Sequence, residues 1–158
     1  MLMMSGSLKR LRADNVILLT ANLGTAESPL AEKAFDRVLL DAPCSGTGVL
    51  RRHPEGKWRK DPLTISQIAR VQEDLLISTA HSLIKGGRLL YTTCSLLEEE
   101  NEEVVDRFLS GSDDMARINL REEFPDWRQD IFTDRGELRL WPHRHDCDGF
   151  YACLMEKR

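Results

Sequence analysis

The sequence predicts an α/β fold, in which helices pack on a sheet, with residues 1–158 forming a single domain. Short apolar runs alternate with longer amphipathic segments, as is typical of α/β proteins. A chain of 158 residues has the size of one ordinary domain with a hydrophobic core. Two apolar runs end in a polar cluster that holds a cysteine, which indicates parallel strands whose ends share one side of the sheet.

The N-terminal part of the chain contains a helix end and one strand-like run. We expect residues 1–7 to be a disordered start. Leu8–Leu11 has the pattern of the last turn of a helix, and Val16–Leu19 is an apolar run that predicts a strand. The polar residues 20–33 predict a loop.

The middle of the chain predicts one strand and the longest helix. Phe35–Leu40 is apolar enough for a buried strand, and the charged residues 51–61 predict a loop. Apolar residues at helical spacing predict a helix over Ile65–Lys85. Thr64 is a suitable N-cap for this helix, and Gly86-Gly87 would end it.

The C-terminal part predicts strands that surround one further helix. Arg88–Tyr91 is a short apolar strand. Glu98–Leu109 predicts a helix whose acidic start suits the positive end of the helix dipole. Arg117–Leu120 and Phe150–Glu156 predict late strands, and Leu138–Trp141 a further short one.

Composition and cysteine spacing exclude several classes of protein. The formal net charge of −4 excludes a surface that is basic throughout, so binding of any nucleic acid would need a local basic patch. No apolar run is long enough to span a bilayer. The cysteines are widely spaced without a C-x-x-C pair, which predicts free thiols in a reducing, cytoplasmic compartment. They are Cys44, Cys94, Cys147 and Cys153.

The most specific local signal is the segment Asp41–Gly48, DAPCSGTG, which follows the first clear strand. It carries a carboxylate and the Cys44 thiol on a glycine-containing loop, where a thiol of lowered pKa would be a nucleophile. A buried structural cysteine is the alternative. A cysteine phosphatase would need arginine at Leu50 and a Walker loop would need lysine at Val49, so both are excluded.

A second cysteine motif, Thr93-Cys94-Ser95, ends the next predicted strand. Together the two motifs resemble those of the Sun-type RNA (cytosine-5) methyltransferases, in which D-A-P-C-S-G-x-G ends one strand and T-C-S ends the next. The resemblance runs from about residue 8 to the end of the chain. Its further landmarks follow in the family's order: Gln72, Glu100-Asn101-Glu102, Pro142-His143 and Asp148-Gly149-Phe150-Tyr151.

The resemblance implies transfer of a methyl group from S-adenosylmethionine to carbon 5 of a cytosine in rRNA or tRNA. Carbon 5 is a poor nucleophile until a thiolate adds to carbon 6, and Cys94 stands at the family's position for that thiolate. Asp41 would hydrogen-bond to or protonate ring nitrogen 3. Cys44 would assist loss of the carbon 5 proton and release of the Cys94 bond.

The resemblance also implies a partial Rossmann-like class I methyltransferase sheet without its first two strands. The family's glycine-rich donor loop belongs to those strands, so we expect an incomplete S-adenosylmethionine site and an inactive isolated chain. In the part of the S-adenosylmethionine site that does not depend on those two strands, the resemblance implies contacts from Asn22, Asp41 and Pro43. An exposed edge on the Phe35–Leu40 strand predicts that Val16–Leu19 docks there, or that the chain dimerises or binds a separate N-terminal half.

One basic and aromatic stretch is a candidate RNA contact. It contains Arg51, Arg52, Lys57, Trp58 and Arg59. Arginine and lysine suit RNA phosphates, and tryptophan can stack on a base. A solvated surface loop is the alternative, but a position beside a pocket for a flipped-out base favours RNA contact.

Other functions are weighed against this one. A non-catalytic RNA-binding or assembly module would keep the pocket without binding the donor. A DNA cytosine methyltransferase would attack with Cys44 and would not need Cys94, and an amine methyltransferase would carry a different motif at Asp41–Cys44. His143 and His145 match no common zinc spacing, so we expect no metal.

Overall fold

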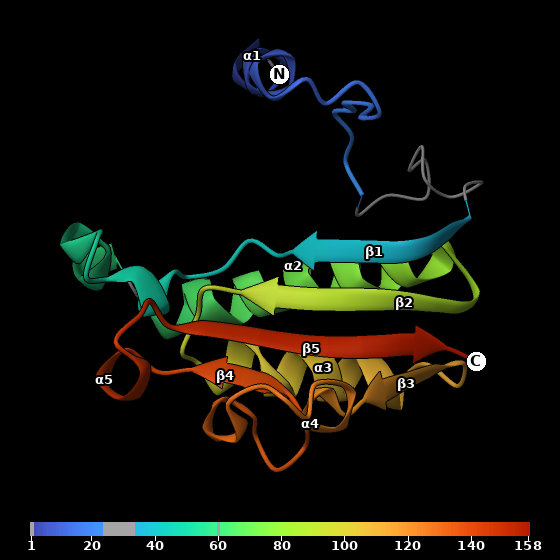
Figure 1. The fold of residues 1–158 in the computed structure, drawn as a ribbon. Helices are drawn as coiled ribbons and strands as arrows, with labels where there is room; N and C mark the ends of the chain where they lie inside the picture. Colours follow the sequence, from blue (N-terminus) through green and yellow to red (C-terminus); the bar gives the residue numbers. More distant parts are fainter. Residues whose placement is uncertain (1, 24–33, 60) are drawn as a thin grey trace.

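The computed structural model describes residues 2–23, 34–59 and 61–158. Over these residues the chain forms a five-stranded mixed sheet with helices packed against it (Figure 1). The predicted α/β fold is therefore confirmed.

The sheet has the strand order β1-β2-β5-β3, and β4 also pairs with β5. β1 and β2 are parallel, whereas β5 is antiparallel to β2, β3 and β4. Their bounds are β1 (Phe35–Asp41), β2 (Leu83–Thr93), β3 (Met115–Ile118), β4 (Leu138–Leu140) and β5 (Phe150–Lys157).

The register of β1 and β2 brings their carboxyl ends together. Leu40 is opposite Tyr91, and Asp41 is opposite Thr92. Because the two strands are parallel and end at the same level, the loops that follow them leave from one edge of the sheet. These are the two loops that carry the cysteine motifs.

Helix α2 (Pro62–His81) is shifted toward the N-terminus relative to the prediction. Its N-cap is Asp61 rather than Thr64, because the Asp61 carboxylate accepts a hydrogen bond from the Thr64 amide at 3.0 Å and proline suits the first helical position. Its C-terminal end is capped by Ser82, and β2 begins at Leu83, so the helix stops before the predicted glycines.

The remaining helices are short. α3 (Glu102–Ser110) overlaps the predicted acidic helix and ends one residue later, and the first turn of the prediction is instead the 3₁₀ helix η3 (Glu98–Glu100). The other helices are α4 (Leu120–Glu123), α5 (Pro142–His145), η1 (Thr47–Val49), η2 (Pro54–Arg59) and η4 (Gln129–Ile131). In the described residues, no helix has both the length and the apolar character needed to cross a bilayer.

The core lies between the sheet and helices α2 and α3, which lie on the same face of it (Figure 1). Leu76, Val104 and Val105 from the helices meet Leu89 and Met155 from the strands, and all five have no exposed surface. Full burial of each such side chain stabilises the fold by about 1.5–3 kcal/mol relative to exposure. This core holds β1, β2 and β5 rigidly beneath the cysteine loops.

The N-terminal segment differs from the prediction. α1 (Leu2–Leu11) ends where a helix end was predicted, but it starts at Leu2, so residues 2–7 of the expected disordered start are helical. The strand predicted at Val16–Leu19 is wrong: the backbone there is irregular, and Ile17 is 84% exposed. An extended segment without a pairing partner is not stable by itself, and Figure 1 shows this part standing off the sheet. Of the predicted loop, residues 24–33 lie outside the described residues.

β1 forms one edge of the described sheet. Among the described residues no strand pairs with its outer side. Val16–Leu19 therefore does not pair with β1, and this prediction is wrong. Dimerisation, or pairing with a separate N-terminal half, stays a prediction.

Candidate active site

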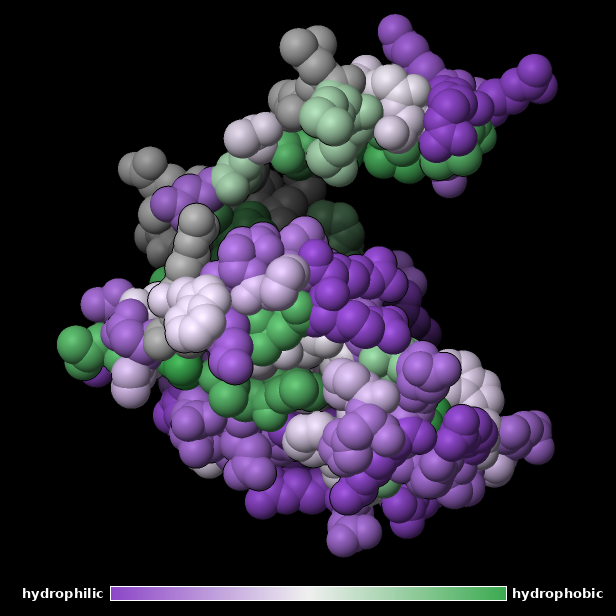
Figure 2. Space-filling model, turned by 90° about the vertical axis from the view of Figure 1, so that its left-hand side faces the viewer, coloured by the Kyte–Doolittle hydropathy of each residue, from purple (hydrophilic) through white to green (hydrophobic). Residues whose placement is uncertain are grey.

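The two cysteine motifs meet at the carboxyl ends of β1 and β2. The sulfur atoms of Cys44 and Cys94 lie 3.1 Å apart, although the residues are far apart in the sequence. Figure 2 views this side of the molecule, where hydrophobic residues gather in the middle and hydrophilic ones surround them. The sequence prediction that both thiols lie at one edge of the sheet is confirmed.

The thiol pair has an unequal distribution of protons. A hydrogen bond from Cys44 lowers the pKa of Cys94 to about 7, against the opposing effects of burial and of the nearby Asp41 and Glu100 carboxylates. The same contact, together with burial, raises the pKa of Cys44. The pair therefore holds its thiolate on Cys94 and its proton on Cys44 near neutral pH. A thiolate is the reactive form of cysteine.

A close crossing of backbones holds the cysteine loops in place. The Gly48 amide donates to the Cys94 carbonyl at 2.9 Å, and the Gly149 amide donates to the Gly48 carbonyl at 2.8 Å. A Cβ on Gly48 would stand 2.3 Å from the Gly149 carbonyl oxygen. Both positions therefore need glycine, which gives a physical reason for the glycine in the D-G-F-Y segment.

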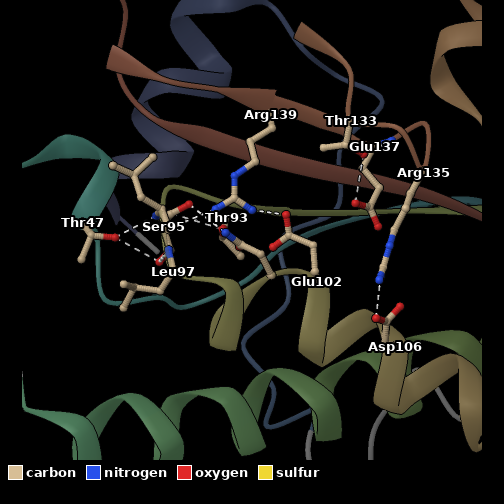
Figure 3. A network of polar contacts seen from close by, with 12 residues as sticks. Thr47, Thr93, Ser95, Leu97, Glu102, Asp106, Thr133, Arg135, Glu137 and Arg139 are labelled. Carbon is tan, nitrogen blue, oxygen red and sulfur yellow. Dashed lines mark hydrogen bonds and ion pairs between the residues drawn. The ribbon is translucent and has the colours of Figure 1, made fainter. Parts of the chain in front are cut away.

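Hydroxyl groups connect the first loop to the second. Thr47 Oγ1 accepts a hydrogen bond from the Leu96 amide at 2.8 Å and lies 3.1 Å from Ser95 Oγ. Ser95 Oγ in turn accepts from the Leu97 amide at 3.1 Å (Figure 3). The polar residues of both motifs thus stabilise one local structure.

Arg139 of β4 fixes the second cysteine loop from the other side. It donates to the Leu96 carbonyl at 2.7 Å and forms an ion pair with Glu102 (Figure 3). Its guanidinium carbon lies 4.5 Å from the centre of the Trp141 ring, within range of a cation–π interaction. Sequence reasoning missed Arg139, because an arginine in a short strand carries no signal that it is buried.

Asp41 and Pro43 lie on the first loop beside the thiols. The exposed Asp41 carboxylate accepts a hydrogen bond from Thr92 Oγ1 at 3.2 Å. The Pro43 carbonyl accepts one from Gln72 Nε2 at 2.8 Å, and Gln72 is fully buried in α2. The glutamine identified as a family landmark therefore anchors the D-A-P-C turn to α2. The ring of Pro43 lines a hollow of about 170 Å³ against the same helix.

Asn22 is placed differently from the prediction. The strand that was predicted shortly before it, Val16–Leu19, does not form. Asn22 is exposed, in the irregular backbone between α1 and residues 24–33.

The basic stretch lies partly on η2 and is exposed. Arg51 and Arg52 form ion pairs with Asp148 at 3.4 and 2.7 Å, which connects the stretch to the D-G-F-Y segment. Trp58 is 83% exposed, and the Lys57 amine lies 5.7 Å from the centre of its ring. The side chain of Arg59 lies outside the described residues.

The C-terminal histidines have local partners. The Trp141 amide donates to His145 Nδ1 at 2.8 Å, and the Trp141 and His143 rings are 5.9 Å apart. In the part of the chain that the structure describes, no group of three or more His, Cys, Asp or Glu side chains is arranged to hold a metal ion.

Comparisons with known proteins identify the family. A family model described as 16S rRNA methyltransferase RsmB/F matches residues 2–156. The probable ribosomal RNA small subunit methyltransferase B of Bacillus subtilis is 36% identical over 140 residues, which cover 88% of this chain and 31% of that protein. The 28S rRNA (cytosine(4447)-C(5))-methyltransferase of Homo sapiens is 37% identical over 166 residues, which cover 96% of this chain and 20% of that protein.

Solved structures show the same fold. NSun6 from Pyrococcus horikoshii with SFG matches with a TM-score of 0.74 and 29% identity, over 98% of this chain and 38% of that one. The partial Rossmann-like methyltransferase sheet is therefore confirmed. This chain spans about a fifth to a third of the length of the curated relatives named above. It belongs to the RsmB/F family of rRNA methyltransferases, which confirms the resemblance to Sun-type RNA (cytosine-5) methyltransferases.

Proposed function

We propose that this chain carries the catalytic residues for methylation of carbon 5 of a cytosine in rRNA, with S-adenosylmethionine as the methyl donor. The contact between Cys44 and Cys94 carries the proposal, because it joins a thiolate and a thiol at the carboxyl ends of parallel strands. Relatives named as rRNA cytosine-C5 methyltransferases support rRNA as the substrate class. Methylation of tRNA is the alternative substrate within the same chemistry.

Cys94 is the proposed nucleophile. Its thiolate adds to carbon 6 of the flipped-out cytosine, and the electron pair of the ring double bond moves toward nitrogen 3. Asp41 hydrogen-bonds to or protonates nitrogen 3, which stabilises the electron-rich adduct. Carbon 5 thereby becomes nucleophilic enough to take the methyl group that S-adenosylmethionine supplies.

Cys44 is proposed to act in the second half of the reaction. A water molecule takes the proton from carbon 5, whose electron pair re-forms the ring double bond, and the bond between carbon 6 and sulfur breaks so that Cys94 leaves as a thiolate. A proton that Asp41 gave to nitrogen 3 returns to Asp41. Cys44 assists this elimination, and its hydrogen bond stabilises the Cys94 thiolate as a leaving group. Its sulfur is 3.1 Å from that of Cys94, so it lies beside the bond that breaks.

The experiment follows loss of tritium from carbon 5 of cytosine in an rRNA fragment, because reversible thiolate addition labilises that position without a methyl donor. We expect release with the wild-type chain and with Cys147→Ser, a matched control in a half-buried cysteine outside the two motifs. Cys94→Ser should abolish release. Release that persists in Cys94→Ser would refute the nucleophile assignment, and no release by any form would refute the addition step for this chain.

The donor contacts are a narrower proposal. The exposed Asp41 carboxylate and the anchored Pro43 turn fit a polar ligand beside the thiols, and they would hold the donor. A contact to Asn22 has no support from the backbone, since residues 16–19 form no strand. We expect no heat in calorimetric titration of this chain with millimolar S-adenosylmethionine, and micromolar binding would refute an incomplete site.

RNA contact is proposed for Arg51, Arg52, Lys57, Trp58 and Arg59. The exposure of Arg51, Arg52 and the Trp58 indole supports phosphate contacts and base stacking. Arg52→Glu should weaken RNA binding and reduce its salt dependence. Lys85→Glu makes the same charge change in an exposed residue at the opposite end of β2, and should have little effect. Equal losses in both variants would refute a local patch.

A non-catalytic RNA-binding module is the second candidate, favoured by the edge of β1, which pairs with no strand among the described residues, and by the exposure of Trp58. It predicts that RNA binds without any loss of tritium from carbon 5. A cytoplasmic location is also proposed, because free thiols such as that of Cys153 suit a reducing compartment.

A further inference from the structure

Glu100 is a fully buried carboxylate at the centre of the two cysteine loops. Its Oε1 accepts a hydrogen bond from the Ser45 amide at 2.7 Å, and its Oε2 accepts one from the Ser45 hydroxyl at 2.5 Å. Oε2 also accepts a hydrogen bond from the Ser95 hydroxyl. A buried charge is costly unless it is hydrogen-bonded, and three donors satisfy this one.

The donors to Glu100 are the chain neighbours of the two thiols. Ser45 follows Cys44 directly, and Ser95 follows Cys94 directly. One carboxylate therefore bridges the two loops within one residue of each sulfur atom.

The backbone that carries this carboxylate is itself fixed. The Tyr91 hydroxyl donates to the Glu100 carbonyl at 2.6 Å. The side chain of the neighbouring Asn101 donates from Nδ2 to the Ser95 carbonyl at 2.9 Å and accepts at Oδ1 from the Thr93 hydroxyl at 2.5 Å. Glu100 thus cannot follow a movement of either loop without breaking several hydrogen bonds, so it acts as a rigid bridge.

We propose that Glu100 is a positioning residue whose carboxylate sets the separation of Cys44 and Cys94. It touches neither sulfur in a hydrogen bond, and acts through Ser45 and Ser95. The importance of this role for methyl transfer rests on the proposed function. The geometric role itself does not, and it can be tested without RNA or methyl donor.

The substitutions at Glu100 separate its hydrogen bonds from its charge. In Glu100→Gln the amide oxygen can still accept from the Ser45 amide, and the NH₂ group can donate to the two serine hydroxyls, which rotate to accept. The bridge is kept while the negative charge is lost. Glu100→Ala removes both. Glu99→Gln is the matched control, because it makes the same chemical change at the exposed neighbouring residue.

The measurement is the pH dependence of Cys94 alkylation by iodoacetamide, resolved by residue with mass spectrometry of the full chain. Loosened loops separate the thiols, so the midpoint in Glu100→Ala should rise from about 7 toward the ordinary thiol value of 9.0. At pH 7 the thiolate fraction then falls by up to roughly 50-fold, while each thiolate becomes roughly 8-fold more nucleophilic. Alkylation should slow by up to about 6-fold.

Only one of the two Glu100 variants, Glu100→Ala, is expected to raise the midpoint of Cys94 alkylation. Glu100→Gln should keep the wild-type midpoint or lower it, because the Glu100 charge itself raises the pKa of Cys94. Glu99→Gln should match the wild type. A folded Glu100→Ala with the wild-type midpoint would overturn the proposal, as would a rise in Glu100→Gln equal to that in Glu100→Ala.

A second variant covers the case in which Glu100→Ala does not fold. Ser45→Ala combined with Ser95→Ala removes the two hydroxyl donors and leaves the bond from the Ser45 amide. The midpoint of Cys94 alkylation should rise in this variant as well. If it is folded and keeps the wild-type midpoint, the bridge does not position the thiols.

Discussion

Gly149→Ala should destabilise the whole domain through a contact at the backbone crossing. The new Cβ would stand 2.5 Å from Leu96 Cδ2 and 2.8 Å from Gly48 Cα. The leucine methyl can rotate away, but the Gly48 backbone cannot, because its amide is bonded to the Cys94 carbonyl at 2.9 Å. The Gly48 contact of 2.8 Å is short of the optimal carbon–carbon separation by about 0.7 Å or more.

The magnitude follows from this geometry. Overpacking of this kind costs about 1–3 kcal/mol, and the backbone constraint favours the upper half of that range. For a domain of this length, each kcal/mol lowers Tm by about 2–4 °C, so we expect a loss of roughly 4–12 °C. Urea denaturation followed by far-UV circular dichroism gives the free energy of unfolding, and calorimetry gives Tm.

Gly111→Ala is the matched control for this measurement. Its Cβ would meet its nearest atoms at 3.7 Å, and its φ of −95° suits alanine. We expect no loss of stability, or a gain of up to about 1 kcal/mol from the reduced entropy of the unfolded chain. A Gly149→Ala variant within about 0.5 kcal/mol of the wild type would refute the reasoning, since surface substitutions have effects of that size.

Three further predictions concern single interactions. Cys44→Ala should raise the midpoint of Cys94 alkylation from about 7 toward 9.0, whereas Cys44→Ser, which keeps a hydroxyl donor, should raise it less; equal midpoints in both variants would contradict the hydrogen bond as the cause. Arg117→Met should cost about 3 kcal/mol in urea denaturation, because Glu137, 1% exposed and 3.1 Å from Arg117, would lose its ion-pair partner; a loss below about 1 kcal/mol would contradict this. Hydrogen bonds from the first turn of α2 lower the pKa of Asp61, so this cap stabilises the fold above its ordinary pKa of 3.8 and is lost as pH falls through the lower folded value. The Tm difference between wild type and Asp61→Ala should therefore shrink as pH falls below 3.8, and a constant difference would refute the charged cap.

The strands and the thiol pair could be predicted because their signals are local. Phe35–Leu40 finishes in three apolar residues, Val38–Leu40, that lead directly into a specific motif, and the apolar residues Leu89–Tyr91 precede the second motif in the same way. Two such ends must meet in a parallel sheet. The sequence therefore predicted the position of Cys44 beside Cys94, but not the contact of 3.1 Å, which depends on long-range hydrogen bonds.

The wrong predictions have two separate physical causes. Val16–Leu19 has the composition of a strand, but a strand needs a partner for its backbone groups, and none pairs with it in the described residues. The end of α2 was predicted too late, because Leu83 and Ile84 fit a helical pattern as well as a strand.

The role of Glu100 was missed for another reason. It lies in a run of acidic residues, and such runs are mostly solvated helix starts. The hydrogen bonds that allow Glu100 to be buried come from serines on two separate loops, and no local sequence pattern indicates those partners. The same holds for Arg139, whose partners lie in other segments of the chain.

The backbone crossing at Gly48, Cys94 and Gly149 has a consequence for folding. The three residues come from distant parts of the chain, so bringing them together lowers the conformational entropy of the long loops between them. The contacts that offset this free-energy cost form only when β1, β2 and β5 are all paired. Before that point each cysteine is an ordinary thiol with an ordinary rate of reaction. Enhanced reactivity of Cys94 at neutral pH is therefore a late event, and in a stopped-flow refolding experiment it would report completion of the native topology rather than the appearance of secondary structure.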